Sequence, residues 1–142
     1  MILNEERKDI FMESTLYSFY KTVNLSYQEA IDKVTDELKK EGFGVLTEID
    51  VKATLKKKLD VDFKPYKILG ACNPPYAHKA LQAEEQIGLM LPCNVVVYEN
   101  KNDEIVVAAI DPIASMHAVN NPELGEIAVT IRDKMQSVIE RM

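Results

Sequence analysis

A short stretch near the middle of the chain, GACNPPYAHKALQ at residues 70–82, gathers residue types that can do chemistry. Cys72 ends an apolar run and is followed at once by Asn-Pro-Pro, a sequence typical of the start of a helix. The free N–H groups and the dipole at a helix start favour an anion, so they would favour a thiolate at Cys72. A thiolate in this place can act as a nucleophile or as a metal ligand.

His78 and Asp111 are the residues that could act together with Cys72. His78 lies one helical turn beyond Pro74, so its imidazole can face the same side and serve as a base or a ligand. Asp111 ends the last predicted strand, and it would join the pair if that strand neighbours the one ending at Cys72. The three groups would suit a transition-metal site or a Cys–His nucleophile pair. The structural alternatives are a buried thiol, a solvent-facing imidazole and an Asp-Pro turn.

Cys93 is the second of the two cysteines, and it begins a valine-rich run. If a helical crossover joins residues 66–72 to residues 93–99, the two strands run parallel and the cysteines lie at opposite ends of the sheet. A strand of this length would then separate them by roughly 20 Å, whereas a disulfide needs α-carbons about 4–7 Å apart. A Cys72–Cys93 pair within the chain is therefore disfavoured unless residues 84–91 carry the chain back across the sheet, and we expect a structural role for Cys93.

Composition and charge exclude several classes of protein. Acidic residues outnumber basic ones by 23 to 17, giving a net charge of −6, which argues against a nucleic-acid partner. No segment approaches the roughly 20 apolar residues that a membrane-spanning helix needs, and charges interrupt the N-terminus, so we expect a cytoplasmic protein with no membrane partner. The chain also lacks an HExxH motif, a nucleophile elbow and a glycine-rich phosphate loop.

Periodicity and capping residues predict an alternation of strands and helices. Ser26 and Glu29 form a capping box ahead of a helical apolar pattern that Gly42 ends. Asp50 is typical of the cap of a short helix, and Asn73 with Pro74 of the start of another. A last helix follows residues 120–122 and carries one long apolar stripe. The predicted strands cover residues 16–23, 43–49, 66–71, 93–99 and 104–110.

This order of elements favours an α+β fold. We expect a two-layer sandwich, with a mixed sheet of about five strands and helices mainly on one face. Residues 1–14 would be an N-terminal extension, residues 15–118 a single α+β domain, and residues 119–142 a C-terminal amphipathic helix. That helix would pack on its own domain or on a dimer partner. An uncovered apolar sheet face would favour a homodimer.

The residues 69–99, LGACNPPYAHKALQAEEQIGLMLPCNVVVYE, carry a resemblance to a known family. This segment, together with GFGVLTEIDV at residues 42–51 and AIDP at residues 109–112, resembles the Domain of Unknown Function 302 family over roughly residues 16–115. The resemblance implies a compact α+β domain that forms homodimers. It implies no established activity and brings no catalytic residues with it.

These observations lead to one main functional hypothesis and two alternatives. The main hypothesis is a homodimeric module that binds a small molecule or a metal near the corner formed by Cys72 and His78. The first alternative is a thiol-dependent enzyme or redox factor that uses Cys72, and the second is a purely structural or interaction protein. No cofactor is established by the sequence, and a transition metal held by Cys72, His78 and Asp111 is the candidate.

Overall fold

The computed structural model describes residues 11–142 and consists of one β-sheet with helices at its side and its end. The strands are β1 (Glu13–Ser14), β2 (Ser18–Val23), β3 (Gly44–Asp50), β4 (Tyr66–Cys72), β5 (Cys93–Glu99) and β6 (Ile105–Ile110). The helices are α2 (Tyr27–Lys40), α3 (Val51–Leu59), α4 (Pro74–Ala83), α5 (Pro112–Met116) and α6 (Gly125–Glu140). Three 3₁₀ helices complete the chain: η1 (Glu85–Met90), η2 (His117–Val119) and η3 (Pro122–Leu124).

The N-terminal extension expected at residues 1–14 falls largely outside the described residues, which begin at Phe11. Its last part, Glu13–Ser14, pairs with β2 and forms the edge of the sheet as β1.

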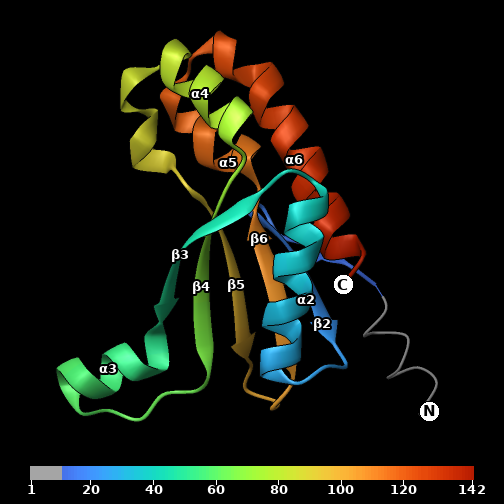
Figure 1. Cartoon of the computed structure of the whole chain (residues 1–142), viewed down its shortest axis with the longest axis vertical. Coiled ribbons are helices and arrows are strands. Elements are labelled where there is room, and N and C mark those ends of the chain that lie inside the picture. The colour runs from blue at the N-terminus through green and yellow to red at the C-terminus, as the bar shows by residue number, and fades with distance from the viewer. Residues whose placement is uncertain (1–10) are drawn as a thin grey trace.

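The sheet has six strands in the order β1-β2-β6-β5-β4-β3, and every neighbouring pair is antiparallel. The α+β class is therefore confirmed. The count of about five strands is not confirmed, because β1 adds a sixth at the edge, and the expected mixed sheet is wrong. The difference in strand direction arises between β4 and β5. Helix α4 and the 3₁₀ helix η1 stay at the end of the sheet where β4 stops, so β5 starts at that same end and runs back (Figure 1).

This reversal also corrects the expected placement of the two cysteines. In the register of β4 and β5, Cys93 lies directly opposite Ala71, the neighbour of Cys72 in the chain. The two cysteines therefore lie at the same end of the sheet. The sequence prediction assumed that a helix between these strands returns the chain to the end of the sheet where β4 begins. That connection would have made β4 and β5 parallel and separated the cysteines.

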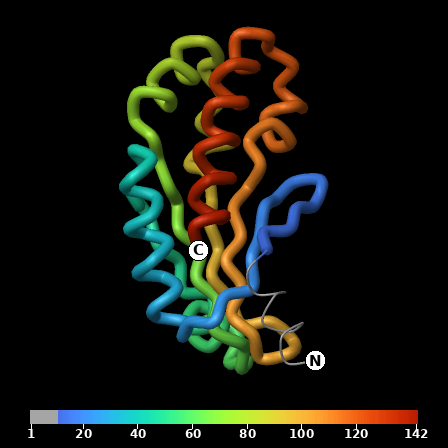
Figure 2. Tube along the Cα trace, turned by 90° about the vertical axis from the view of Figure 1, so that its right-hand side faces the viewer, coloured from blue at the N-terminus to red at the C-terminus, as the bar shows by residue number. Residues whose placement is uncertain are grey.

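Helices α2 and α6 cover one face of the sheet and enclose the main core. Figure 2 shows them side by side along the strands. Inward-facing strand residues such as Leu69, Val95 and Ala109 share one buried cluster with Met135 and Val138 from the apolar stripe of α6. All five are fully buried or nearly so. Helix α6 thus belongs to the core of its own chain.

Local capping signals in the sequence explain where α2 begins and ends. Ser26 accepts a hydrogen bond from the Glu29 backbone N–H, and the Glu29 carboxylate accepts one from the Ser26 N–H, so the predicted capping box is confirmed. Gly42 follows the helix with φ +86°, a conformation that only glycine adopts without strain. The residue after this turn, Phe43, is buried, and β3 begins directly afterwards.

A second, smaller cluster of buried residues lies at the end of the sheet beyond β4 and β5. There, Ala80 of α4 and Met116 of α5 pack with Ala128 near the start of α6 (Figure 1). Helix α3 lies at the opposite end and buries none of its residues. The corner between β4 and α4 is thus held between the main core and this end cluster.

Candidate functional site

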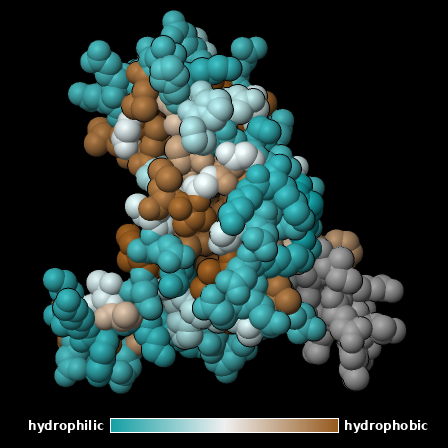
Figure 3. Space-filling view, viewed as in Figure 1, coloured by the Kyte–Doolittle hydropathy of each residue, from teal (hydrophilic) through white to brown (hydrophobic). Residues whose placement is uncertain are grey.

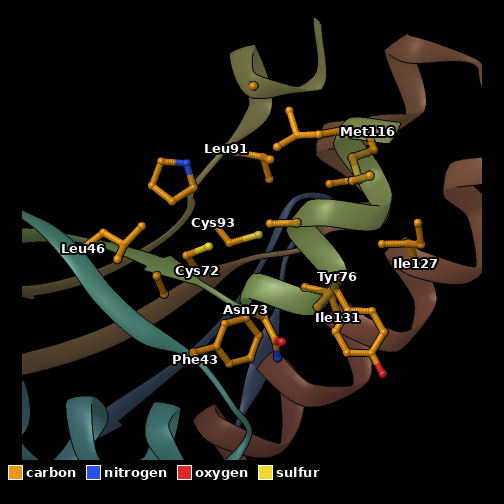
Figure 4. A pocket seen from close by; sticks show the side chains of 16 residues that line it. Phe43, Leu46, Cys72, Asn73, Tyr76, Leu91, Cys93, Met116, Ile127 and Ile131 are labelled. Carbon is orange, nitrogen blue, oxygen red and sulfur yellow. The ribbon is translucent and has the colours of Figure 1, made fainter. Parts of the chain in front are cut away.

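A cavity of about 280 Å³ lies at the corner where β4 ends and α4 begins (Figure 4). Its walls come from seven elements or their flanks, far apart in the sequence. The lining residues are Phe43, Leu46, Ala71, Cys72, Asn73, Tyr76, Ala77, Ala80, Leu81, Gly88, Leu91, Pro92, Cys93, Met116, Ile127 and Ile131. The stretch at residues 70–82 therefore forms one wall of a cavity.

The lining is almost entirely apolar and contains no charged side chain. Leu46 of β3 and Leu81 of α4 are 67% and 43% exposed, so they form part of an open rim. Figure 3 shows hydrophobic side chains gathered in the hollow between the helical end of the molecule and α3. An apolar concave surface with few polar groups is typical of a small-molecule site.

Two thiols enter this cavity. Cys72 ends β4 and is half-buried, while Cys93 begins β5 and is buried. Figure 4 shows the two side chains on the same side of the cavity, next to Leu91 and Leu46. Burial, and to a smaller extent the nearby Cys72, raises the pKa of the Cys93 thiol to about 11. Cys93 is therefore an uncharged thiol at neutral pH.

Asn73 occupies the expected N-cap position of α4 but does not act as a side-chain cap. Pro74 and Pro75 have no N–H groups to donate, and the backbone N–H groups of Tyr76 and Ala77 both donate to the Asn73 carbonyl oxygen. The expected free N–H groups at this helix start are consequently absent. The corner offers no built anion site to hold a thiolate.

The Asn73 side chain instead joins the corner to the end of α2. It is 7% exposed, and its Nδ2 donates to the backbone carbonyl oxygen of Glu41 at 3.0 Å. Gly42 lies against it, since a Cβ built on Gly42 would come within 3.2 Å of Nδ2. Asn73 therefore fixes the position of the cavity wall relative to the main core.

The predicted partners of Cys72 do not join it. His78 is exposed and does not line the cavity. Asp111 accepts a hydrogen bond at 2.9 Å from the Ile113 N–H and caps α5, a short helix that stands where the sequence predicted only an Asp-Pro turn. Among residues 11–142, no three His, Cys, Asp or Glu side chains are grouped so that they could hold a metal ion. The structure therefore does not assemble Cys72, His78 and Asp111 into a site.

The far wall of the cavity was missed by sequence reasoning. Met116 of α5 and Ile127 and Ile131 of α6 complete it. Their apolar spacing predicts only that they are buried, because nothing in a helical stripe shows which surface it packs against. Leu46 was missed as well, because it is one of several apolar residues in the predicted strand 43–49 and no local pattern marks it as part of a cavity rim.

A family model matches this chain over most of its length. The family model described as "Domain of unknown function DUF302" matches residues 19–142. The chain belongs to the DUF302 family. The match extends past residue 115, where the sequence resemblance was expected to stop, and it includes α6. That extension agrees with the burial of α6 in the core of this DUF302 chain.

A solved structure is similar to this DUF302 protein along most of its length. It is the crystal structure of an uncharacterized conserved protein DUF302 from Bacillus stearothermophilus, with 32% sequence identity and a TM-score of 0.83. The similarity covers 89% of this chain and 98% of that chain. No curated protein matches the chain. Within residues 11–142, no helix combines the length and the apolar character needed to cross a membrane.

Proposed function

We propose that this DUF302 protein binds a small, uncharged and mainly apolar molecule in the cavity between β4, β5 and α4. The observation that carries the proposal is the cavity itself, with about 280 Å³ of space and no charged lining residue. Protein interiors are normally close-packed, and an unfilled apolar void lowers stability. An engineered apolar cavity of about 150 Å³ is already large enough to bind benzene.

The lining also limits the chemistry of the ligand. A carboxylate or phosphate inside the cavity would lose its hydration and meet no cation in return. The polar groups available are the Cys72 and Cys93 thiols, the Asn73 amide and the Tyr76 hydroxyl. These can orient one or two neutral polar groups on an otherwise apolar molecule. We therefore favour an aromatic or branched hydrocarbon skeleton with at most a hydroxyl, carbonyl or N–H group.

Indole is a suitable probe because it is neutral, planar and carries a single donor. We expect saturating indole to raise the melting temperature by at least about 5 °C, since a ligand at one hundred times its Kd stabilises the folded state by about 2.7 kcal/mol. In ¹H–¹⁵N spectra the shifts should centre on residues 71–81 and 88–93. The measurements are a thermal melt and an NMR titration.

Two variants on the same helix provide the comparison. Ala77→Phe places a ring in the cavity and should abolish the response to indole, whereas His78→Phe adds the same ring to an exposed position outside the cavity and should leave it intact. Indole shifts scattered over the surface, or equal binding by both variants, would contradict the proposal.

We also propose that two copies of the chain associate through the sheet face that α2 and α6 leave open. One row across this face consists of Ile49, Ile68, Val96, Ala108 and Tyr20, which are paired in register across five strands. None of these side chains is charged, although the whole chain carries a net charge of −6. A carboxylate contacts one end of the row, where Glu13 accepts a hydrogen bond from the Tyr20 hydroxyl. A second copy of this face can therefore approach the centre of the row without like-charge repulsion there, and both copies would bury apolar surface.

A further inference from the structure

The two cysteines of the chain, distant in sequence, meet at one end of the sheet and line one cavity. Cys93 opens β5 directly opposite Ala71, and Cys72 is the next residue along β4. Both thiols are free in the structure, and both line the cavity at the corner of β4 and α4. Figure 4 shows the two sulfur atoms on the same side of that cavity.

The register places the α-carbons of Cys72 and Cys93 at a distance that a disulfide can bridge. Neighbouring strands lie about 4.8 Å apart and one residue advances a strand by about 3.3 Å, so a one-residue offset gives about 6 Å. Disulfides span α-carbon distances of about 4.4–6.8 Å. Side chains of such a pair normally point to opposite faces, but β4 ends at Cys72, where the backbone turns into α4. That turn allows both side chains to enter the cavity.

We infer that Cys72 and Cys93 are a dithiol pair, brought together by the fold and not activated by an anion site, which a hydroperoxide converts into an intrachain disulfide inside the cavity. Cys72 is half-buried and lies nearer to solvent, so it is the thiol that the peroxide meets first. Cys93 is buried beside it and serves as the resolving thiol.

The reaction balances in two steps. The Cys72 sulfur loses its proton and attacks one peroxide oxygen, the O–O bond breaks, and a sulfenic acid forms while the departing oxygen takes up the proton and leaves as water, or as an alcohol from an organic hydroperoxide. The Cys93 sulfur then attacks the Cys72 sulfur, the S–O bond breaks, and the hydroxyl leaves with the Cys93 proton as a second water. Two thiols are oxidised to one disulfide, and one peroxide is reduced.

The second thiol beside Cys72 favours disulfide formation over further oxidation of Cys72. The sulfenic acid would form with a second thiol already held within reach, so the resolving step needs no other molecule. The lining offers no third thiol and no charged group to divert the reaction. A thiol-based reductant reverses the disulfide by exchange.

The test uses the reduced full-length chain and hydrogen peroxide alone, so it does not depend on whether a ligand binds the cavity. Intact mass spectrometry should show a loss of about 2 Da, corresponding to two hydrogens, and dithiothreitol should restore the mass. Tryptic digestion should link the peptide of residues 68–79 to that of residues 80–101 under non-reducing conditions.

The single-cysteine variants separate the two roles. In Cys93→Ser, Cys72 should instead be trapped by dimedone as a sulfenic acid, and in Cys72→Ser, Cys93 should remain reduced at the same peroxide dose. Wild-type protein that gains oxygen on Cys72 without losing 2 Da would overturn the inference. Cross-linking only between two chains would overturn it as well.

Discussion

At the scale of single residues, Asn73 lies at the N-cap position of α4, but its side chain bonds to the end of α2 instead of capping α4. A residue before Pro-Pro is expected to cap the helix with its own side chain. Pro75 removes one N–H group that such a cap would bind, and the Tyr76 N–H donates to the Asn73 backbone carbonyl oxygen, so the side-chain amide is free to donate to Glu41 at the end of α2. The corner of the cavity is thereby tied to a helix more than thirty residues away in sequence.

This assignment makes a prediction that distinguishes the two roles. Asn73→Asp keeps the shape and acceptor capacity of a helix cap but loses the donor to the Glu41 carbonyl. We expect the variant to lose about 1–3 kcal/mol in the free energy of unfolding, because a buried acceptor is left unpaired and a carboxylate replaces a neutral amide. Urea unfolding measures the change.

Asp50→Asn is the matched control, because the Asp50 side chain caps α3 only by accepting from the Ala53 N–H. That exchange should alter stability by no more than about 0.5 kcal/mol. If Asn73→Asp were equally neutral, the side chain of Asn73 would not be holding the corner.

The candidate site was predictable from the sequence only in part, and the reason is physical. Cys72 and the start of α4 follow from local chemistry, since an apolar run and Asn-Pro-Pro mark a strand end and a helix start. The position of Cys93 depends on whether the chain crosses the sheet between residues 84 and 92. That choice is decided by packing of α4 against α5 and α6, which local patterns do not encode.

At the scale of elements, the C-terminal helix α6 is attached to α2 by a partly buried ion-pair cluster. Arg141 donates from Nε to the Glu37 carboxylate at 2.6 Å and from NH1 to Glu41 at 3.0 Å, and Lys40 donates to Glu37 at 2.8 Å. The hydrogen bond from Lys40, followed by the one from Arg141, lowers the pKa of Glu37 below its ordinary value of 4.5. The charged form of Glu37 therefore stabilises the packing of α6 on α2.

The sign of the pH dependence follows from this lowered pKa. Glu37 contributes stability above pH 4.5, where it is ionised in both folded and unfolded chains, and the contribution is lost as pH falls through its folded pKa. We expect Glu37→Gln to cost about 1 kcal/mol at pH 7, and the difference from wild type to shrink below pH 4.5. Urea unfolding at several pH values tests this.

Asp36→Asn on the same helix controls for the general effect of removing one negative charge, since Asp36 is exposed. It should change stability little at any of these pH values. A Glu37→Gln penalty that stays constant down to pH 3 would show that packing, and not the ion pairs, accounts for the loss.

The elements themselves were largely predictable because their ends are marked locally. The capping box of α2, Gly42 after it and Asp50 before α3 all act as their sequence contexts suggested. The directions of β4 and β5 were not predictable, because they depend on contacts between residues far apart in the chain. Local signals therefore define where elements begin and end, and packing defines how they are connected in space.

At the scale of the whole molecule, the helices of residues 11–142 cover only one face of the sheet. Helices α2 and α6 bury the inner face, while the opposite face carries the row of Ile49, Ile68, Val96, Ala108 and Tyr20 described above. Ile49, at one end of the row, is 49% exposed. An antiparallel sheet can leave one face to water when that face is polar. Here the row is apolar, which is why we propose a second copy of the chain as its partner.

The proposed homodimer predicts a solution mass of twice the 16.1 kDa of one chain, measured by light scattering after size exclusion. Val96 lies at the centre of the row, so in a two-fold interface Val96→Glu would bring two carboxylates into an apolar contact. We expect at least about a tenfold rise in the dimer dissociation constant.

Val129→Glu makes the same exchange on α6 at a position that is 41% exposed and off the sheet, and it should leave the mass unchanged. A monomeric wild-type chain at tens of micromolar, or dissociation caused only by Val129→Glu, would rule out this face as the interface.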